Sequence, residues 1–132
     1  MVAGVPVDAL TPYAHVVDLE RSIAFYALVG FSVRNEARDG DRLSWAFLTT
    51  PSPEPNEARG RLMLGRAEEP GDPERQGALF YCWSADVAQL RDDLLAADVE
   101  VSAIEHPAYM PAGEIEVRDP DGYLLVIGQL GE

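Results

Sequence analysis

Two strands and a tight turn are encoded in the stretch Gly113-Glu-Ile-Glu-Val-Arg-Asp-Pro-Asp-Gly-Tyr-Leu-Leu-Val-Ile-Gly-Gln129. Ile115 and Val117 alternate with charged residues, which is the period-two pattern of a half-buried strand, and Tyr123–Ile127 is a short apolar run typical of a second strand. Between them, Asp119–Gly122 has the composition of a turn, because proline fixes φ and glycine tolerates a positive φ. We therefore predict an antiparallel hairpin.

The chain also contains an internal repeat. A shift of 68 residues places Tyr13 on Tyr81 and Val17-Asp18-Leu19 on Ala85-Asp86-Val87. In each copy a strand leads to an aspartate that caps a helix, and apolar residues at three- and four-residue spacing give that helix one buried face. The predicted helices are Leu19–Val29 and Val87–Ala97. The predicted strands are Pro12–Val17, Phe31–Ala37, Arg42–Thr49, Arg61–Leu64, Ala78–Ser84, Glu100–Glu105, Gly113–Arg118 and Tyr123–Gly128.

These elements predict an α+β fold of two βαβββ modules in one domain, residues 1–132. The first module spans residues 8–66, a proline- and glycine-rich linker spans 67–77, and the second module spans 78–130. Because each helix has a single apolar face, we expect it to cover a sheet. An ordinary α+β sandwich is the alternative architecture.

Charge and composition exclude several classes of partner. The net charge of −13, with −1 in residues 1–66 and −12 in residues 67–132, disfavours nucleic acid and anionic membrane surfaces. No apolar run reaches the length of a membrane span, and the N-terminus lacks the basic region of a secretory signal. The single cysteine, Cys82, forms no internal disulfide, and its position predicts a buried, inert thiol. We expect a cytoplasmic protein.

Two motifs at opposite ends of the chain carry a family resemblance. Tyr13–Tyr26 resembles the first strand and helix of the vicinal oxygen chelate superfamily, and Asp119–Tyr123 resembles the turn of its last hairpin. This superfamily includes glyoxalase I, bleomycin-resistance proteins and extradiol dioxygenases. The resemblance implies a curved, mixed-sheet cup of the glyoxalase/bleomycin resistance/dioxygenase-like fold and a homodimer. The modules of the cup pair either within one chain or by exchange between two chains.

The metal ligands of the enzymes in that superfamily are missing at the matching positions. These positions are occupied by Thr11, Met63, Leu79 and Val126, and none of them is a good ligand for a divalent ion. We therefore predict neither a metal nor another cofactor. A displaced site would have to use His15, His106, Glu114 and Glu116.

Strand parity selects the residues of the predicted cup, because successive side chains point to opposite faces. Tyr13 and His15 share one face of the first strand, and the repeat places Tyr81 and Trp83 on the equivalent face. Ser44–Leu48 has bulky residues on both parities, so the orientation of its two rings stays open. The candidate ligand-binding residues are Tyr13, His15, Trp45, Phe47, Met63, Tyr81, Trp83 and Glu114.

Aromatic walls with a carboxylate suit an aromatic or cationic small molecule. The sequence thus favours a metal-free binding protein that sequesters such a compound. The alternatives are a lyase, isomerase or dioxygenase with a displaced metal site, or a module with a structural or regulatory role.

Overall fold

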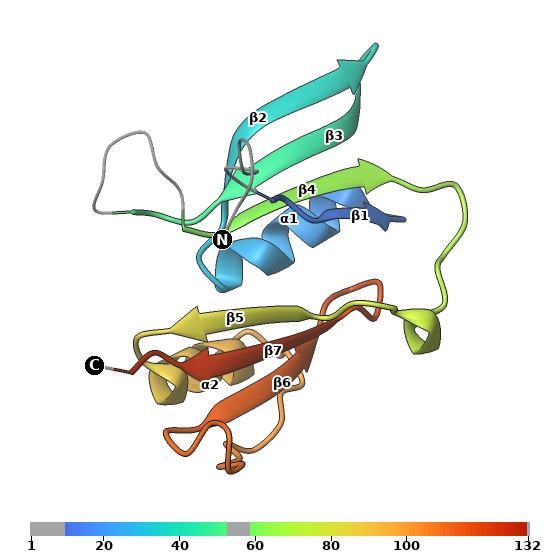
Figure 1. The fold of residues 1–132 in the computed structure, drawn as a ribbon. Coiled ribbons are helices and arrows are strands. Elements are labelled where there is room, and N and C mark those ends of the chain that lie inside the picture. The colour runs from blue at the N-terminus through green and yellow to red at the C-terminus, as the bar shows by residue number, and fades with distance from the viewer. Residues whose placement is uncertain (1–9, 53–58, 132) are drawn as a thin grey trace, which may run out of the picture.

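A computed structural model describes residues 10–52 and 59–131 and contains two sheets and two α-helices (Figure 1). The start of the first module and most of the proline-rich loop at 51–56 lie outside the described residues. The first sheet has the order β1-β4-β3-β2 and the second has the order β5-β7-β6. The elements are β1 (Tyr13–Val16), α1 (Leu19–Leu28), β2 (Ser32–Asp39), β3 (Arg42–Thr49), β4 (Arg61–Arg66), β5 (Phe80–Ser84), α2 (Val87–Ala96), β6 (Glu114–Arg118) and β7 (Leu124–Gln129).

Both helices begin and end as the sequence predicts, to within one residue. The side chain of Asp18 accepts a hydrogen bond from the Arg21 amide at 3.0 Å, and Asp86 does the same for Gln89. Such bonds satisfy amides that have no partner inside the helix. After α1, Gly30 has φ +97°, a conformation that glycine adopts without steric cost, and the chain turns back toward the sheet.

The hairpin predicted at 113–129 is confirmed. β6 and β7 pair antiparallel, with Ile115 opposite Ile127. In the turn, Oδ1 of Asp119 accepts hydrogen bonds from the amides of Asp121 at 2.9 Å and Tyr123 at 2.8 Å. Gly122 has φ +90°, the positive value that closing the hairpin requires.

The predicted strand Glu100–Glu105 is wrong, so the second sheet has three strands instead of four. The segment makes only two isolated bridges to β6, at Val101 and Glu105. Ser102 explains the interruption. Its hydroxyl accepts the Glu116 amide at 2.8 Å, while its carbonyl accepts a hydrogen bond from the Arg91 guanidinium. Side chains thus take bonds that a regular ladder would make between backbones.

A single hydrophobic core joins the two modules. It includes Val16 and Leu64 from the first sheet, Ile115 and Ile127 from the second, and Tyr26 from α1. α1 therefore contributes to the packing of both modules. The two-module α+β fold expected from the sequence is confirmed.

The linker between the modules carries a short 3-10 helix, Pro73–Arg75, and is fastened to the start of β7. The side-chain amide of Gln76 donates to the Leu124 carbonyl at 3.2 Å and accepts from the Leu124 amide at 2.7 Å. Within the described ranges, no helix is both long and apolar enough to cross a membrane.

Candidate functional site: two open sheet faces

The first sheet has one face covered by α1 and one face left open. On the covered face Ala14, Leu62 and Leu64 are buried. The residues with the opposite parity form the first open face, and this includes both rings of β3 whose orientation the sequence left undecided. The first open face consists of Tyr13, His15, Trp45, Phe47 and Met63.

Two rows of residues cross the first open face. Met63 lies between its register partners Tyr13 and Phe47, and Gly65 lies between His15 and Trp45. A Cβ atom on Gly65 would overlap the ring of Tyr13, so the glycine allows that ring to lie flat over the strand. The rings of Tyr13 and His15 have centroids 5.0 Å apart. With Tyr13 half exposed, this face presents aromatic surface to solvent.

The second sheet repeats this arrangement. Gly128 lies between its register partners Trp83 and Glu114, just as Gly65 lies between His15 and Trp45. A Cβ on Gly128 would lie 3.1 Å from the Tyr81 hydroxyl and 3.0 Å from Cε of Met110. We call Tyr81, Trp83 and Glu114, together with Tyr109 and Met110, the second open face.

Glu114 is the polar centre of the second open face, and its side chain is buried with only 6% exposure. One carboxylate oxygen accepts a hydrogen bond from the hydroxyl of Tyr81 at 3.0 Å, and the other accepts from the hydroxyl of Tyr109. The hydrogen bond and the negative charge of Glu114 raise the pKa of Tyr109 to about 12. Burial and the same carboxylate raise the pKa of Tyr81.

Tyr109 and Met110 were not predicted from the sequence. They lie in the connection that precedes β6, where no periodicity indicates the direction of a side chain. The glycine in the central part of each open face, however, was predictable from a sequence pattern. Leu62-Met-Leu-Gly-Arg66 and Leu125-Val-Ile-Gly-Gln129 share one pattern and place Gly65 and Gly128 at equivalent positions.

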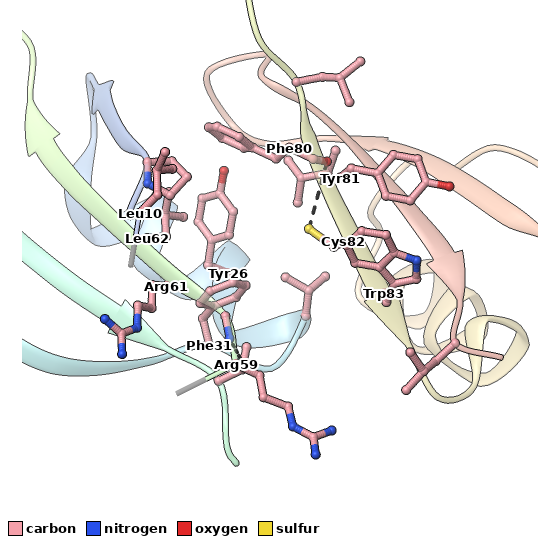
Figure 2. Close-up of a pocket in the computed structure, with 17 residues that line it drawn as sticks. Leu10, Tyr26, Phe31, Arg59, Arg61, Leu62, Phe80, Tyr81, Cys82 and Trp83 are labelled. Carbon is pink, nitrogen blue, oxygen red and sulfur yellow. Dashed lines mark hydrogen bonds between the residues drawn. The ribbon is translucent and has the colours of Figure 1, made fainter. Parts of the chain in front are cut away.

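A cavity of about 1000 Å³ separates parts of the two modules (Figure 2). Its apolar lining includes Leu62 and Phe31 from the first module and Phe80 and Leu125 from the second. Among the predicted site residues only Tyr81 and Trp83 border it. In Figure 2 their rings point away from the first module, whereas Phe80 points toward it.

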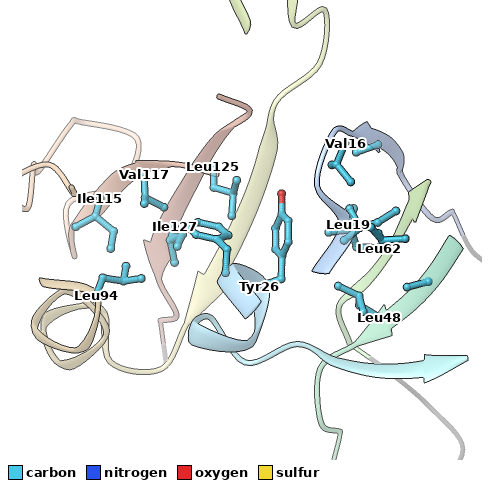
Figure 3. Close-up of a cluster of buried hydrophobic side chains, with 14 of the residues drawn as sticks. Val16, Leu19, Tyr26, Leu48, Leu62, Leu94, Ile115, Val117, Leu125 and Ile127 are labelled. Carbon is cyan, nitrogen blue, oxygen red and sulfur yellow. The ribbon is translucent and has the colours of Figure 1, made fainter. Parts of the chain in front are cut away.

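The two open faces do not meet within one chain. The covered faces of both sheets belong to the shared core, where Tyr26 lies between Leu125 and Ile127 on one side and Leu62 on the other (Figure 3). The open faces point away from that core. Among residues 10–52 and 59–131, no hydrogen bond or ring contact links His15 or its neighbours on the first open face to Glu114.

The residues of this chain do not fit a metal ion at the superfamily's ligand positions. Thr11, Met63, Leu79 and Val126 supply one hydroxyl and one thioether, which are poor donors for a hard divalent ion. Within the described part of the chain, no three His, Cys, Asp or Glu side chains come close enough together to hold a metal. A single chain therefore does not assemble the displaced set of His15, His106, Glu114 and Glu116.

Cys82 lies on the covered parity of β5 and lines the cavity between the modules. Its side chain is partly buried, and burial raises the pKa of its thiol. A raised pKa lowers the thiolate fraction and hence the reactivity of the thiol. The predicted burial of Cys82 is thus only partial, and its lack of reactivity stays a prediction.

Comparison with known proteins identifies the family. A model of the Glyoxalase/Bleomycin resistance protein/Dioxygenase superfamily matches residues 12–127, so the chain belongs to this superfamily. No curated protein matches the sequence.

Solved structures reproduce the fold. A bleomycin-binding protein in complex with bleomycin is 20% identical with a TM-score of 0.70, covering 95% of this chain and 100% of its own. A bleomycin resistance determinant encoded on the transposon Tn5 is 21% identical with a TM-score of 0.68, covering 96% and 100%. A glyoxylase/bleomycin resistance protein/dioxygenase domain from Frankia sp. EAN1pec is 17% identical with a TM-score of 0.72, covering 96% and 98%. At these identities the likeness concerns the fold.

Proposed function

We propose that this protein binds and sequesters a small aromatic or cationic compound without using a metal ion. One observation supports the proposal above all others. The positions where metal-dependent relatives carry ligands hold Thr11, Met63, Leu79 and Val126, while the open faces around them carry exposed rings. The rings pair as Tyr13 with His15 and Tyr81 with Trp83, each at 5.0 Å between centroids. Such surfaces stack on flat ligands and attract cations.

We further propose that two copies of the chain form the binding cup, with the first open face of one copy opposite the second open face of its partner. β1 and β5 are edge strands, and each has an edge that no described strand of the same chain pairs with. Leu10, Leu79 and Leu130 are 82%, 51% and 49% exposed around the cavity that borders β5. Exposed strand edges beside apolar side chains are typical of surfaces that a second chain covers. A twofold dimer would produce two equivalent cups.

The binding proposal predicts tight association with a compound such as bleomycin, which one structural relative binds. Protein should be treated with a chelator, dialysed and titrated calorimetrically with metal-free bleomycin and with a set of flat amines. At least one of these compounds should bind without added metal. Binding that disappears after chelation and returns with one equivalent of a divalent ion would contradict the metal-free mechanism. If none of the compounds binds, the proposed function itself is wrong.

The dimer proposal has a separate test. Light scattering across micromolar concentrations should give twice the chain mass of 14.4 kDa. A monomer over that whole range would contradict the shared cup, because each chain would then expose two unconnected half-sites.

A further inference from the structure

The carboxylate of Glu114 is almost fully buried, and none of the described residues gives it a positively charged partner. Its side chain is 6% exposed, and both of its hydrogen-bond donors are neutral phenols, those of Tyr81 and Tyr109. The ion pairs found in the described ranges join Arg38 to Glu36, Arg66 to Glu20 and Arg75 to Asp72, so none involves Glu114. A buried charge without an opposite charge is costly, and proteins normally pair it.

Aromatic rings and the thioether of Met110 share the open side of the sheet with this carboxylate. Trp83 and Glu114 are the two register partners of Gly128, so their side chains point to the same face. Two strand spacings separate them, which is about 10 Å between their backbones. The Tyr81 and Trp83 rings lie 5.0 Å apart and are inclined by 50°. Trp83 is 59% exposed and offers its ring to a ligand.

We propose that Glu114 binds a protonated amine of the ligand while the ligand's flat body packs on Trp83 and Tyr81. This inference rests on the proposed function, that the open faces bind a small molecule, and it assigns the cationic ligand class to one residue. The ammonium group supplies the opposite charge that the buried carboxylate lacks, and the rings stabilise it further through their negative faces. An anionic ligand would be repelled by Glu114.

Tyr109 controls access to the carboxylate. Its side chain is 71% exposed although its hydroxyl bonds Glu114, so the ring is able to turn away while losing little packing. An incoming ammonium group then takes over the carboxylate oxygen that the Tyr109 hydroxyl occupied. Tyr81 keeps the second oxygen in place.

The test uses two probes of almost equal shape, naphthylmethylamine, which is protonated at neutral pH, and the neutral naphthylmethanol. Their affinities for the 132-residue chain are measured by calorimetry and by shifts of the β6 and β7 amide resonances. We expect the native protein to bind the amine about tenfold or more tightly than the alcohol, as a charge-assisted hydrogen bond provides. Glu114→Gln keeps the size and most of the hydrogen bonding of the side chain but should abolish this preference.

Glu116→Gln is the matched control, because Glu116 lies two residues along β6 with the same parity but is exposed. It removes the same charge from the same strand and should leave the preference for the amine within about threefold of native, as expected of a solvent-screened charge. Tyr109→Phe removes the competing hydroxyl and should bind the amine at least as tightly as native. If Tyr109→Phe lost as much affinity for the amine as Glu114→Gln, this would contradict the proposal that the amine displaces the Tyr109 hydroxyl.

The outcomes separate this inference from the function on which it rests. If both probes bind the native protein equally, or if Glu114→Gln keeps the preference for the amine, the assignment to Glu114 is overturned while aromatic binding stands. If neither probe binds at millimolar concentration, both are overturned. An unchanged melting temperature for Glu114→Gln shows that a loss of binding does not arise from unfolding.

Discussion

The hydroxyl of Tyr26 on α1 donates a hydrogen bond of 2.8 Å to Oδ2 of Asp119, which lies 93 residues away in the turn between β6 and β7. The side chain of Tyr26 is 1% exposed and that of Asp119 is 5% exposed. Nearby, Oδ1 of Asp121 accepts the Val17 amide at 2.9 Å. The last hairpin is thereby fixed to the first strand and helix, and the two motifs that identify the family are parts of one contact.

Tyr26→Phe should lower the free energy of unfolding by about 1–3 kcal/mol, because it leaves a buried carboxylate oxygen without that donor. Urea denaturation at neutral pH measures the change. Tyr123→Phe is the control, since the Tyr123 hydroxyl bonds the His15 carbonyl at a more exposed position and its removal should cost less. Equal effects of the two substitutions would contradict the role given to Asp119.

The effect of Tyr26→Phe should depend on pH. Burial raises the pKa of Asp119 above its ordinary value of 3.8, while the Tyr26 hydrogen bond opposes this rise. Because the pKa of Asp119 is higher in the folded state than in the unfolded state, the free energy of unfolding of the native protein increases as pH falls from the folded-state pKa toward 3.8. Without the Tyr26 hydroxyl the pKa of Asp119 should rise further, so Tyr26→Phe should gain more stability than the native protein as pH falls. The deficit, meaning the difference between their free energies of unfolding, should therefore shrink at lower pH.

Unfolding free energies of both proteins from pH 7 down to pH 4 test this expectation. In an Asp119→Asn background the deficit of Tyr26→Phe should be independent of pH. A deficit that grows as pH falls would contradict the stated effect of the Tyr26 hydrogen bond on the pKa of Asp119.

Gly122→Ala should destabilise the protein more than Gly40→Ala. Both glycines have positive φ, +90° and +63°, so alanine is strained at each position. At Gly122 a Cβ would also lie 2.8 Å from Cβ of Pro73 in the linker, whereas at Gly40 it would meet no atom of the described residues within 4 Å. Overpacking of this kind costs about 1–3 kcal/mol beyond the shared strain. Equal changes in melting temperature for the two variants would show that the linker moves away from the new Cβ at no energetic cost.

The phenol of Tyr109 should titrate unusually high. Because Glu114 holds the pKa of Tyr109 at about 12, Glu114→Gln should move it down toward the ordinary value of 10.0. Titration of carbon-labelled tyrosine followed by magnetic resonance resolves the individual residues. A pKa for Tyr109 that does not change with Glu114→Gln would mean that the hydrogen bond between them does not form in solution.

The sequence predicted both helices, the final hairpin and the face of Tyr13 and His15, because these depend on local patterns such as caps, turn residues and strand parity. It did not predict that Ser102 interrupts the strand expected at Glu100–Glu105, since this depends on the hydrogen bonds of one side chain. The Tyr109 contact with Glu114 was missed for a similar reason. It is formed by an irregular connection that folds back onto β6.

The sequence also did not predict how the two open faces are oriented relative to each other. Strand parity assigns a side chain to a face of its own sheet, but it does not say how two sheets pack on each other. In this chain the covered faces share one core through α1, so the walls of the predicted cup point away from each other. This arrangement leads to the proposal that a second copy completes the cup.

Mixed dimers test that central claim most directly. One chain carries Tyr13→Ala and His15→Ala on the first open face, and the other carries Glu114→Gln on the second. The two chains bear different affinity tags, so that mixed dimers can be isolated. If cups form between chains, each mixed dimer has one cup with two intact walls and one with two altered walls, and naphthylmethylamine should bind with native affinity at about half of the sites. Mixed dimers that bind no better than either parent, or a failure of the chains to associate, would contradict the account.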